Sequence, residues 1–261
     1  MKQKIYQVDA FTDHLFGGNP AAVCPLDDWP NDDIMQKIAM ENNLSETAFY
    51  VKRGDRFHIR WFTPAVEVDL CGHATLATAY VIFSHEHINQ KKISFISDRS
   101  GVLNVTENSD FLTLDFPADP PVEVELTGEL SSAFNIRPWK ALKGRTDYLL
   151  VFGNEEEILA LVPDIEKISY FNCRGVIVTS EGRDVDFVSR FFAPQSGVNE
   201  DPVTGSAHTT LTPYWASRLG KSEMTARQLS KRKGSLRCRM SGDRVEISGQ
   251  CRLYMTGEIS F

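Results

Sequence analysis

The sequence predicts an α+β protein built from two similar halves. A stretch that starts at Phe57, FHIRWFTPAVEVDLCGHATLATAY, recurs in looser form from Phe187 as FVSRFFAPQSGVNEDPVTGSAHTTLTPYW. Each copy begins with a strand-like pattern that ends in Phe-x-Pro and finishes with the spacing of an amphipathic helix. The 261 residues, 42% of them apolar, are enough for two halves of roughly 130 residues each.

The two copies keep a nearly constant spacing along the chain. Phe62 lies 130 positions before Phe192, and Gly72 lies 133 positions before Gly205. The offset of 133 continues downstream, where GVLNVTENSDFLTLDF aligns with GSLRCRMSGDRVEISG. A constant offset through a helix and a hairpin indicates duplication. We therefore expect an N-terminal half, 1–117, and a C-terminal half, 118–261, joined by the proline-rich segment FPADPPVEVEL.

The same elements are expected in the same order in each half. A strand, a glycine turn and a second strand lead into a loop and a long helix, and a hairpin closes the unit. The long helices are predicted to start near Gly72 and Gly205, and Pro213 is expected to kink the second one or shift its start. A further helix is predicted over 31–42, with Asn31 as its N-cap.

Composition excludes several classes of function. The net charge of −7 gives no electrostatic reason to bind nucleic acid or an anionic membrane. No apolar run approaches the ~18 residues that a transmembrane helix needs, and no apolar signal region follows the first residues. The five cysteines contain no CxxC pair, so we expect neither a disulfide framework nor a zinc site. These features predict a cytoplasmic protein with reduced thiols.

The two predicted helix starts are candidate anion-binding sites. The first turn of a helix has unpaired N–H groups and a partial positive charge, which together bind carboxylates. The sequences CGHAT and TGSAH place a glycine at each start, so that a ligand can approach the backbone. Such donors suit proton transfer at a carbon next to a carboxylate, because they stabilise the negative charge that develops. The candidates for the base are Glu46, His73, Asp201, Cys71 and His208.

Two other motifs are assigned no function. His85 and His87 are two residues apart and do not share one face of a helix, so we expect no metal site there. The stretch LFGGNP lacks the GK[ST] ending of a phosphate-binding loop and is interpreted as a turn that enters a strand.

Four stretches, in order, resemble the signature motifs of the PhzF-like isomerase family of phenazine biosynthesis: VDAFTDHLFGGNPAAVC, NNLSETAFYV, DLCGHATLATA and NEDPVTGSAH. The resemblance runs through nearly the whole chain. It implies the diaminopimelate-epimerase fold, with two pseudo-symmetric halves, each a mixed β-sheet wrapped around a central helix, and an active site in the cleft between them. It also implies a homodimer, and proton transfer on a small carboxylic acid without a cofactor or metal.

The resemblance assigns roles to individual residues. Glu46, in the SETAF stretch, resembles the catalytic acid/base of the family. His73 and Asp201 match the other two catalytic positions, one in each half. Gly72, Gly205 and Ser206 match the anion-binding helix starts, and the motif that contains Asn19 lines the same cleft.

One departure distinguishes this sequence from two-thiol epimerases. Diaminopimelate epimerases carry a cysteine at both helix starts, whereas this chain has Cys71 at the first and Thr204 at the second. A hydroxyl, with a pKa far above 10, cannot replace a thiolate as the base. Two alternatives remain: an amino-acid epimerase that uses Cys71 with a non-thiol partner, and a non-catalytic binding or adaptor protein on the same scaffold. The sequence does not identify the substrate.

Overall fold

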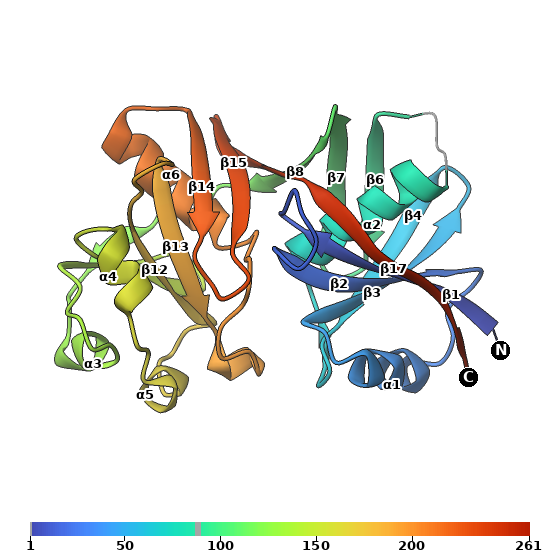
Figure 1. Ribbon diagram of the computed structural model, residues 1–261, viewed down its shortest axis with the longest axis horizontal. Helices are drawn as coiled ribbons and strands as arrows, with labels where there is room; N and C mark the ends of the chain where they lie inside the picture. The colour runs from blue at the N-terminus through green and yellow to red at the C-terminus, as the bar shows by residue number, and fades with distance from the viewer. Residues whose placement is uncertain (1, 87–89) are drawn as a thin grey trace. The chain divides into compact units, whose positions relative to one another are not determined.

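Residues 2–86 and 90–261 are described by the structure, a computed structural model, and they form two compact units (Figure 1). Unit 1 comprises the chain up to Asp115 together with Ser248–Phe261, and unit 2 comprises Phe116–Ile247. His87, one of the two histidines considered above for a metal site, lies outside the described residues.

Unit 1 is a mixed β-sheet with two helices. Its strands are β1 (Lys2–Ala10), β2 (Asn19–Leu26), β3 (Glu46–Arg53), β4 (Arg56–Phe62), β5 (Glu67–Val68), β6 (Lys92–Ser97), β7 (Gly101–Asn108), β8 (Phe111–Pro117) and β17 (Cys251–Ser260), and the last two residues of β8 lie past the unit boundary. Its helices are α1 (Asp32–Asn42) and α2 (Gly72–His85). The pairs β2–β3 and β4–β6 are parallel, and β1–β2, β3–β4, β6–β7 and β7–β8 are antiparallel.

Unit 2 repeats this pattern of strand pairing. Its strands are β9 (Val122–Val124), β10 (Lys140–Lys143), β11 (Asp147–Val151), β12 (Gly175–Glu181), β13 (Phe187–Phe192), β14 (Glu223–Gln228), β15 (Gly234–Ser241) and β16 (Arg244–Gly249), the last of which extends past the unit boundary. Its helices are α3 (Gly128–Ser132), α4 (Glu155–Ala160), α5 (Ile165–Ser169), η1 (Pro194–Ser196) and α6 (His208–Leu219). The pairs β11–β12 and β13–β14 are parallel, and β10–β11, β12–β13 and β14–β15 are antiparallel.

The offset of the sequence repeat is visible in the element boundaries. β7 spans residues 101 to 108 and β15 spans 234 to 241, so both ends differ by 133. β4 and β13 end at Phe62 and Phe192, which differ by 130. The structure therefore confirms the predicted α+β fold with two repeated halves.

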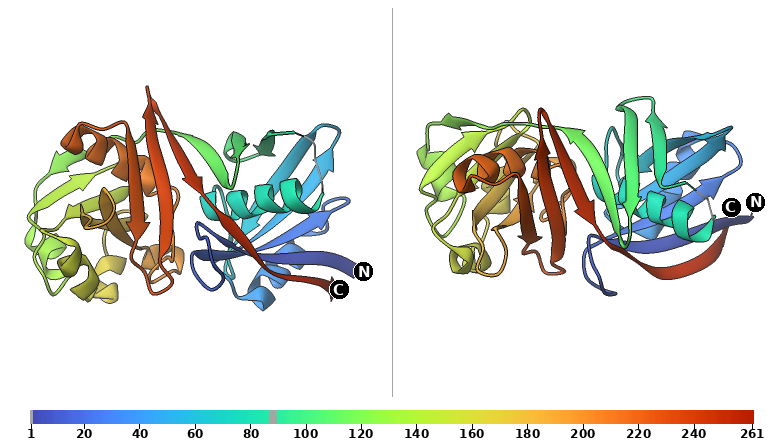
Figure 2. Two further views of the ribbon diagram at one scale, coloured as in Figure 1. Left: turned by 45° about the horizontal axis from the view of Figure 1, so that its top comes forward. Right: turned by 90° about the horizontal axis from the view of Figure 1, so that it is seen from above.

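The helix α2 is the centre of unit 1. It packs against β1, β2 and β3, whose strands curve around it (Figure 2). Almost all of its side chains are buried, as expected for a helix that is covered on every side. The hydroxyl groups of Thr75 and Thr78 are satisfied locally, because they donate to the carbonyl oxygens of Cys71 and Ala74 at 2.6 and 2.7 Å.

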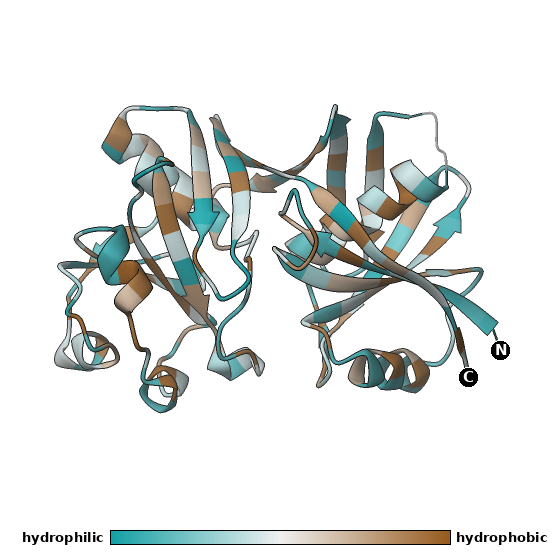
Figure 3. Ribbon diagram, viewed as in Figure 1, coloured by the Kyte–Doolittle hydropathy of each residue, from teal (hydrophilic) through white to brown (hydrophobic). Residues whose placement is uncertain are grey.

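Strand side chains alternate between the two faces of the sheet. In β6, Ile93 and Phe95 are buried while Lys92 is exposed, and Figure 3 shows the corresponding alternation of hydropathy along the strands. The predicted helix α1 is confirmed with its N-cap, since the Asn31 side chain accepts a hydrogen bond from the Asp33 N–H at 3.0 Å.

Pro213 lies inside α6, and the helix starts later than its counterpart. α2 begins at Gly72 itself, whereas α6 begins at His208, three residues after Gly205. Pro213 has no N–H to donate to the carbonyl oxygen of Thr209, four residues earlier. That oxygen instead accepts from the Asp119 N–H at 3.0 Å, which fastens the connecting segment onto α6.

The last strand returns to unit 1. β17 pairs antiparallel with β1 over nearly its whole length, from Ala10↔Cys251 to Lys2↔Ser260. The compact units are therefore not two consecutive stretches of chain. The sequence division at 117/118 placed residues 248–261 in the C-terminal half, whereas they belong to unit 1. In the described part of the chain, no helix is both long and apolar enough to cross a membrane.

Gly249 and Gly257 offer a matched test of packing in unit 1. A Cβ at Gly249 would lie 2.3 Å from Cδ1 of the fully buried Phe11, whereas a Cβ at Gly257 would meet only Ile5 Cγ2, at 3.6 Å. We predict that Gly249→Ala lowers the free energy of unfolding by about 1–3 kcal/mol. Gly257→Ala should change it by less than about 0.5 kcal/mol. Urea denaturation of both variants measures the difference, and equal stabilities would contradict the predicted packing.

Candidate active site

Five of the predicted site residues lie together in unit 1. Asn19 and Glu46 are the first residues of the parallel neighbours β2 and β3, and the start of α2 supplies Cys71, Gly72 and His73. The two strand starts and the helix start therefore place polar groups around a single imidazole ring.

His73 is the centre of this group. Its Nε2 atom lies 3.3 Å from Glu46 Oε2. Its Nδ1 atom lies 3.1 Å from Asn19 Nδ2 and 3.5 Å from Cys71 Sγ. With the Asn19 amide oriented as a donor, Nδ1 is the acceptor, so the proton of a neutral ring is on Nε2, on the side of Glu46.

Burial keeps the imidazole neutral. His73 is 4% exposed, Asn19 is fully buried, and the Glu46 side chain is 16% exposed. Loss of solvation lowers the pKa of His73 to about 3. At neutral pH the contact between His73 and Glu46 is therefore not an ion pair. It brings a neutral N–H group beside the carboxyl group of a side chain that is not fully buried.

The same three side chains could be considered for a metal, because ligand atoms of Glu46, Cys71 and His73 all lie within 4.8 Å of one another. However, Glu46 faces Nε2 of His73, while Cys71 faces Nδ1. An imidazole ligates an ion through one nitrogen, so an ion on either nitrogen would lie on the side of only one of the other two groups. The geometry suits an acid/base group better than a chelate.

The start of α2 lacks the usual cap. Cys71 occupies the N-cap position, but its side chain makes no capping hydrogen bond to the helix, and the first turn contains no acidic residue. The N–H groups of Gly72, His73 and Ala74 have no partner inside the helix, because an α-helix leaves its first N–H groups unpaired. Donors in the first helical turn suit a bound carboxylate.

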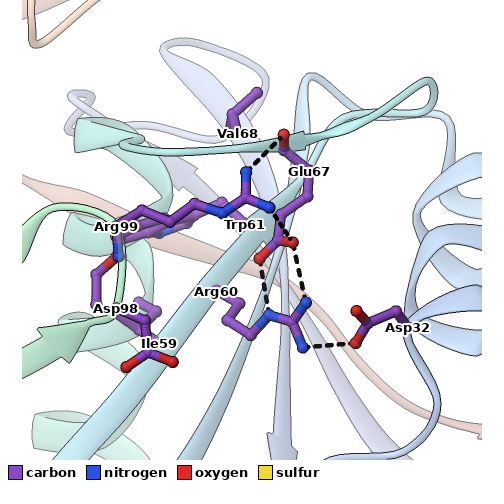
Figure 4. A pocket seen from close by; sticks show the side chains of 9 residues that line it. Asp32, Ile59, Arg60, Trp61, Glu67, Val68, Asp98 and Arg99 are labelled. Atoms are coloured by element: carbon purple, nitrogen blue, oxygen red, sulfur yellow. Dashed lines mark hydrogen bonds and ion pairs between the residues drawn. The ribbon is translucent and has the colours of Figure 1, made fainter.

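An ionic network holds the segment that leads into α2 (Figure 4). Arg60 binds both oxygens of Glu67, at 2.7 and 2.9 Å, and Arg99 binds Glu67 Oε2 at 2.8 Å. Arg99 also binds Asp69 Oδ1 at 3.0 Å. Arg60, Glu67 and Arg99 line a pocket of about 290 Å³ beside β4. The guanidinium groups are occupied by carboxylates, so the network fixes the residues before Cys71 and is not an open anion site.

The remaining predicted site residues, Asp201, Gly205 and Ser206, lie in unit 2 before α6. Asp201 Oδ2 accepts a hydrogen bond of 2.5 Å from the Thr204 hydroxyl. Residues 205–207 form a turn, and among the described residues no backbone carbonyl outside regular helices and strands accepts a hydrogen bond from the N–H groups of Gly205, Ser206 or Ala207. Like the start of α2, this turn presents consecutive N–H groups.

Arg174 adds a positive charge beside this turn. Its Nη1 donates to Ser206 Oγ at 2.8 Å, and its Nε donates to Asp147 Oδ1 at 2.9 Å. Asp147 is 1% exposed, so Arg174 neutralises a buried carboxylate while it contacts the turn. The serine hydroxyl accepts from Arg174, which leaves its own proton available to a ligand.

His208, also among the candidate bases, is a packed residue of α6. It is fully buried, its ring lies 5.9 Å from that of Phe187, and Nδ1 is 2.9 Å from the Thr204 carbonyl oxygen. Burial lowers its pKa to about 4. We therefore assign it a structural role.

Sequence reasoning missed three polar residues that support these groups: Arg99, Arg174 and Gln228. Each acts across a long sequence separation, for example 24 residues between Gln228 and Thr204. None belongs to a local motif: Arg99 lies in the turn after β6, Arg174 lies just before β12, and Gln228 ends β14. The sequence does not show which distant loop such a polar side chain contacts.

The chain was compared with known proteins. The family model described as phenazine biosynthesis-like protein, PhzC-PhzF, matches residues 8–257. An uncharacterised isomerase of Pseudomonas aeruginosa is 52% identical over 259 residues, which is 99% of each chain. The crystal structure of a PhzF family protein from Enterococcus faecalis covers 100% of both chains with a TM-score of 0.97 and 44% identity.

More distant structures share only the fold. A hydroxyproline epimerase of Agrobacterium vitis, solved with bound trans-4-hydroxy-L-proline, is 7% identical and has a TM-score of 0.64. It covers 99% of this chain and 92% of its own. The resemblance stated from the motifs is therefore confirmed: the chain belongs to the PhzC-PhzF family of phenazine biosynthesis-like proteins and is an isomerase.

Proposed function

We propose that this isomerase moves a proton within a small carboxylic acid, without a cofactor, and that Glu46 is the acid/base. The observation that carries the proposal is the contact of Glu46 with a neutral, buried His73 at the uncapped start of α2. A carboxyl group that accepts and returns a proton needs access to the substrate and a neighbour that does not trap it as a fixed ion pair. The partly exposed Glu46 beside a neutral imidazole meets both needs.

The start of α2 supplies the complementary electrostatics. Removal of a proton next to a carboxylate places negative charge on the carboxylate oxygens. N–H donors already aimed at those oxygens stabilise this charge without reorganisation, and one such donor is worth about 3 kcal/mol. The N–H groups of Gly72 and His73 are proposed as these donors. The His73 ring, held by Asn19, is proposed to donate from Nε2 to Glu46 or to the substrate.

Asp201, Gly205 and Ser206 are proposed to orient the substrate. The support is the turn before α6, with its consecutive N–H groups and the contact of Arg174 with the serine hydroxyl. That these residues and the residues around Glu46 act on one substrate stays a prediction from the sequence repeat. The homodimer stays a prediction from the resemblance to the PhzF-like family.

A second candidate is an epimerase that uses Cys71 as the base. The observation that favours it is the 3.5 Å contact of Cys71 Sγ with His73 Nδ1, since a histidine can accept a thiol proton. Against it, burial disfavours an imidazolium at His73, and Cys71 itself is 6% exposed. Position 204 carries a hydroxyl instead of a second thiol.

The first prediction concerns Glu46. The wild-type protein is incubated in D2O with a panel of small carboxylic acids, including trans-4-hydroxy-L-proline and unsaturated acids, and deuterium uptake is followed by mass spectrometry. Glu46→Gln is nearly isosteric but cannot take a proton, so it should slow uptake by about 100-fold or more. Glu41→Gln changes an exposed glutamate of α1 and should leave the rate unchanged. Equal uptake by wild type and Glu46→Gln would remove Glu46 from the mechanism.

The second prediction concerns the protonation of His73. Because its pKa is lowered to about 3, the ring should stay neutral from pH 8 to pH 5, with its proton on Nε2. Below pH 6.5 the unfolded chain takes up a proton at this histidine and the folded protein does not. Its contribution to the stability should therefore fall by about 1.4 kcal/mol per pH unit as the pH decreases toward 4. Nitrogen-15 NMR of the histidines checks the tautomer, and a titration of His73 near pH 6.5 would contradict the prediction.

The third prediction separates the two candidate bases. Cys71→Ser should keep deuterium uptake within about threefold of the wild type if Glu46 is the base, since a thiol beside the ring then has no chemical step to perform. In the epimerase alternative the same variant should lose about 100-fold or more. Cys24→Ser, a change at a buried cysteine of β2, controls for the loss of a core thiol.

A further inference from the structure

Thr204 occupies the position where two-thiol epimerases have their second cysteine, and its hydroxyl is fully engaged. It donates to Asp201 Oδ2 at 2.5 Å and accepts from Gln228 Nε2 at 3.2 Å. An amide nitrogen can only donate, so the single hydroxyl proton of Thr204 is directed to the aspartate. The direction of this hydrogen-bonded chain is therefore fixed.

Gln228 also holds the backbone of the same loop. Its Oε1 accepts from the Thr204 N–H at 2.9 Å, and its Nε2 donates to the Asp201 carbonyl oxygen at 2.8 Å. Nearby, Ser230 donates to the Pro202 carbonyl oxygen at 2.8 Å. Gln228 is fully buried and Ser230 is 5% exposed, so both act in a low-dielectric environment where hydrogen bonds are strong.

We propose that Thr204, held by Gln228, is a positioning residue that fixes the carboxylate of Asp201, so that position 204 orients an acid instead of transferring a proton. The inference rests on the proposed function, in which Asp201 contacts the substrate. It explains why a threonine can stand where other members of the fold use a thiol: the side chain must accept one hydrogen bond and donate another in a buried loop, and a hydroxyl does both more strongly than a thiol.

The test compares two substitutions at this position. Thr204→Val keeps the shape but removes the hydroxyl, and it should lower the maximal rate of deuterium uptake by about tenfold or more, because a displaced orienting group misaligns the substrate. Thr204→Ser keeps the hydroxyl and should stay within about threefold of the wild type. The probe is the acid of the panel that the wild-type protein labels.

A matched control comes from α6 in the same unit. Thr210 is 1% exposed and its hydroxyl also donates to an aspartate, Asp119, at 3.0 Å. Thr210→Val therefore removes a buried threonine–aspartate hydrogen bond of the same kind, outside the proposed site. It should destabilise the protein similarly in thermal denaturation and leave deuterium uptake unchanged. A loss of uptake equal to that of Thr204→Val would show that the effect is merely structural.

A double-mutant cycle tests whether Thr204 acts through Asp201. If it does, Thr204→Val should have no further effect once Asp201→Asn is present, because the group that it positions has already been changed. Effects that multiply would overturn the proposal. So would a Thr204→Ser variant as slow as Thr204→Val.

Crystal structures of the two variants at position 204 distinguish failure of this inference from failure of the proposed function. We expect the Asp201 carboxylate to rotate or disorder in Thr204→Val and to keep its place in Thr204→Ser. If no acid is labelled by the wild type, the proposed function fails, and the crystal structures still decide the positioning role. An unmoved Asp201 in Thr204→Val overturns it.

Discussion

The start of α2 is buried within the sheet of its own unit and lacks a side-chain cap, and the rest of the candidate site depends on this constraint. Unpaired N–H groups in a buried place are costly, and most proteins satisfy them with a Ser, Thr, Asp or Asn at the N-cap. Here Cys71 occupies that position, and the ordered segment before it is held by Arg60 and Arg99 through Glu67. In the proposed function, these N–H groups bind the carboxylate of the substrate.

The same burial determines the chemistry of the neighbouring side chains. Because His73 cannot easily become charged, it acts as a neutral hydrogen-bonding group whose tautomer is set by Asn19. Glu46 is less buried, and in the proposed function it is the group beside the ring that exchanges a proton with the substrate. Two neighbouring residues thus differ in role because their solvation differs, and no metal is needed in this proposal. In unit 2, the segment before the equivalent helix is held differently, by the hydrogen bond between Thr204 and Asp201 in the loop that precedes α6.

The sequence was sufficient for the architecture because duplication leaves a measurable offset. The offsets of 130 and 133 recur in the ends of β4 and β13 and of β7 and β15, and the helices that follow the glycines are present. The helix α6 starts three residues after the predicted position, Gly205. Pro213 lies inside this helix and removes one of its backbone hydrogen bonds. The return of β17 to unit 1 depends on a pairing over about 250 positions, which local pattern does not encode.

For the site, the motifs were enough to select Glu46, His73 and Asn19, which the fold brings into contact. They were not enough to find Gln228 at the end of β14 or Arg174 just before β12, since the role of each side chain depends on which distant loop lies beside it. The contact of Thr204 with Asp201 spans only three residues, but the hydrogen bond that Thr204 accepts from Gln228 spans 24. The site residues within local motifs were therefore predictable, and their hydrogen-bond partners from distant parts of the chain were not.

The central claim is that the carboxylate of a substrate binds at the start of α2 within reach of Glu46. A crystal structure with a bound small carboxylic acid tests it most directly. The account predicts a carboxylate oxygen at about 3 Å from the N–H of Gly72 or His73, and the neighbouring carbon within about 3.5 Å of a Glu46 carboxyl oxygen. An acid bound with its carboxylate away from these N–H groups, or with no carbon near Glu46, would contradict it.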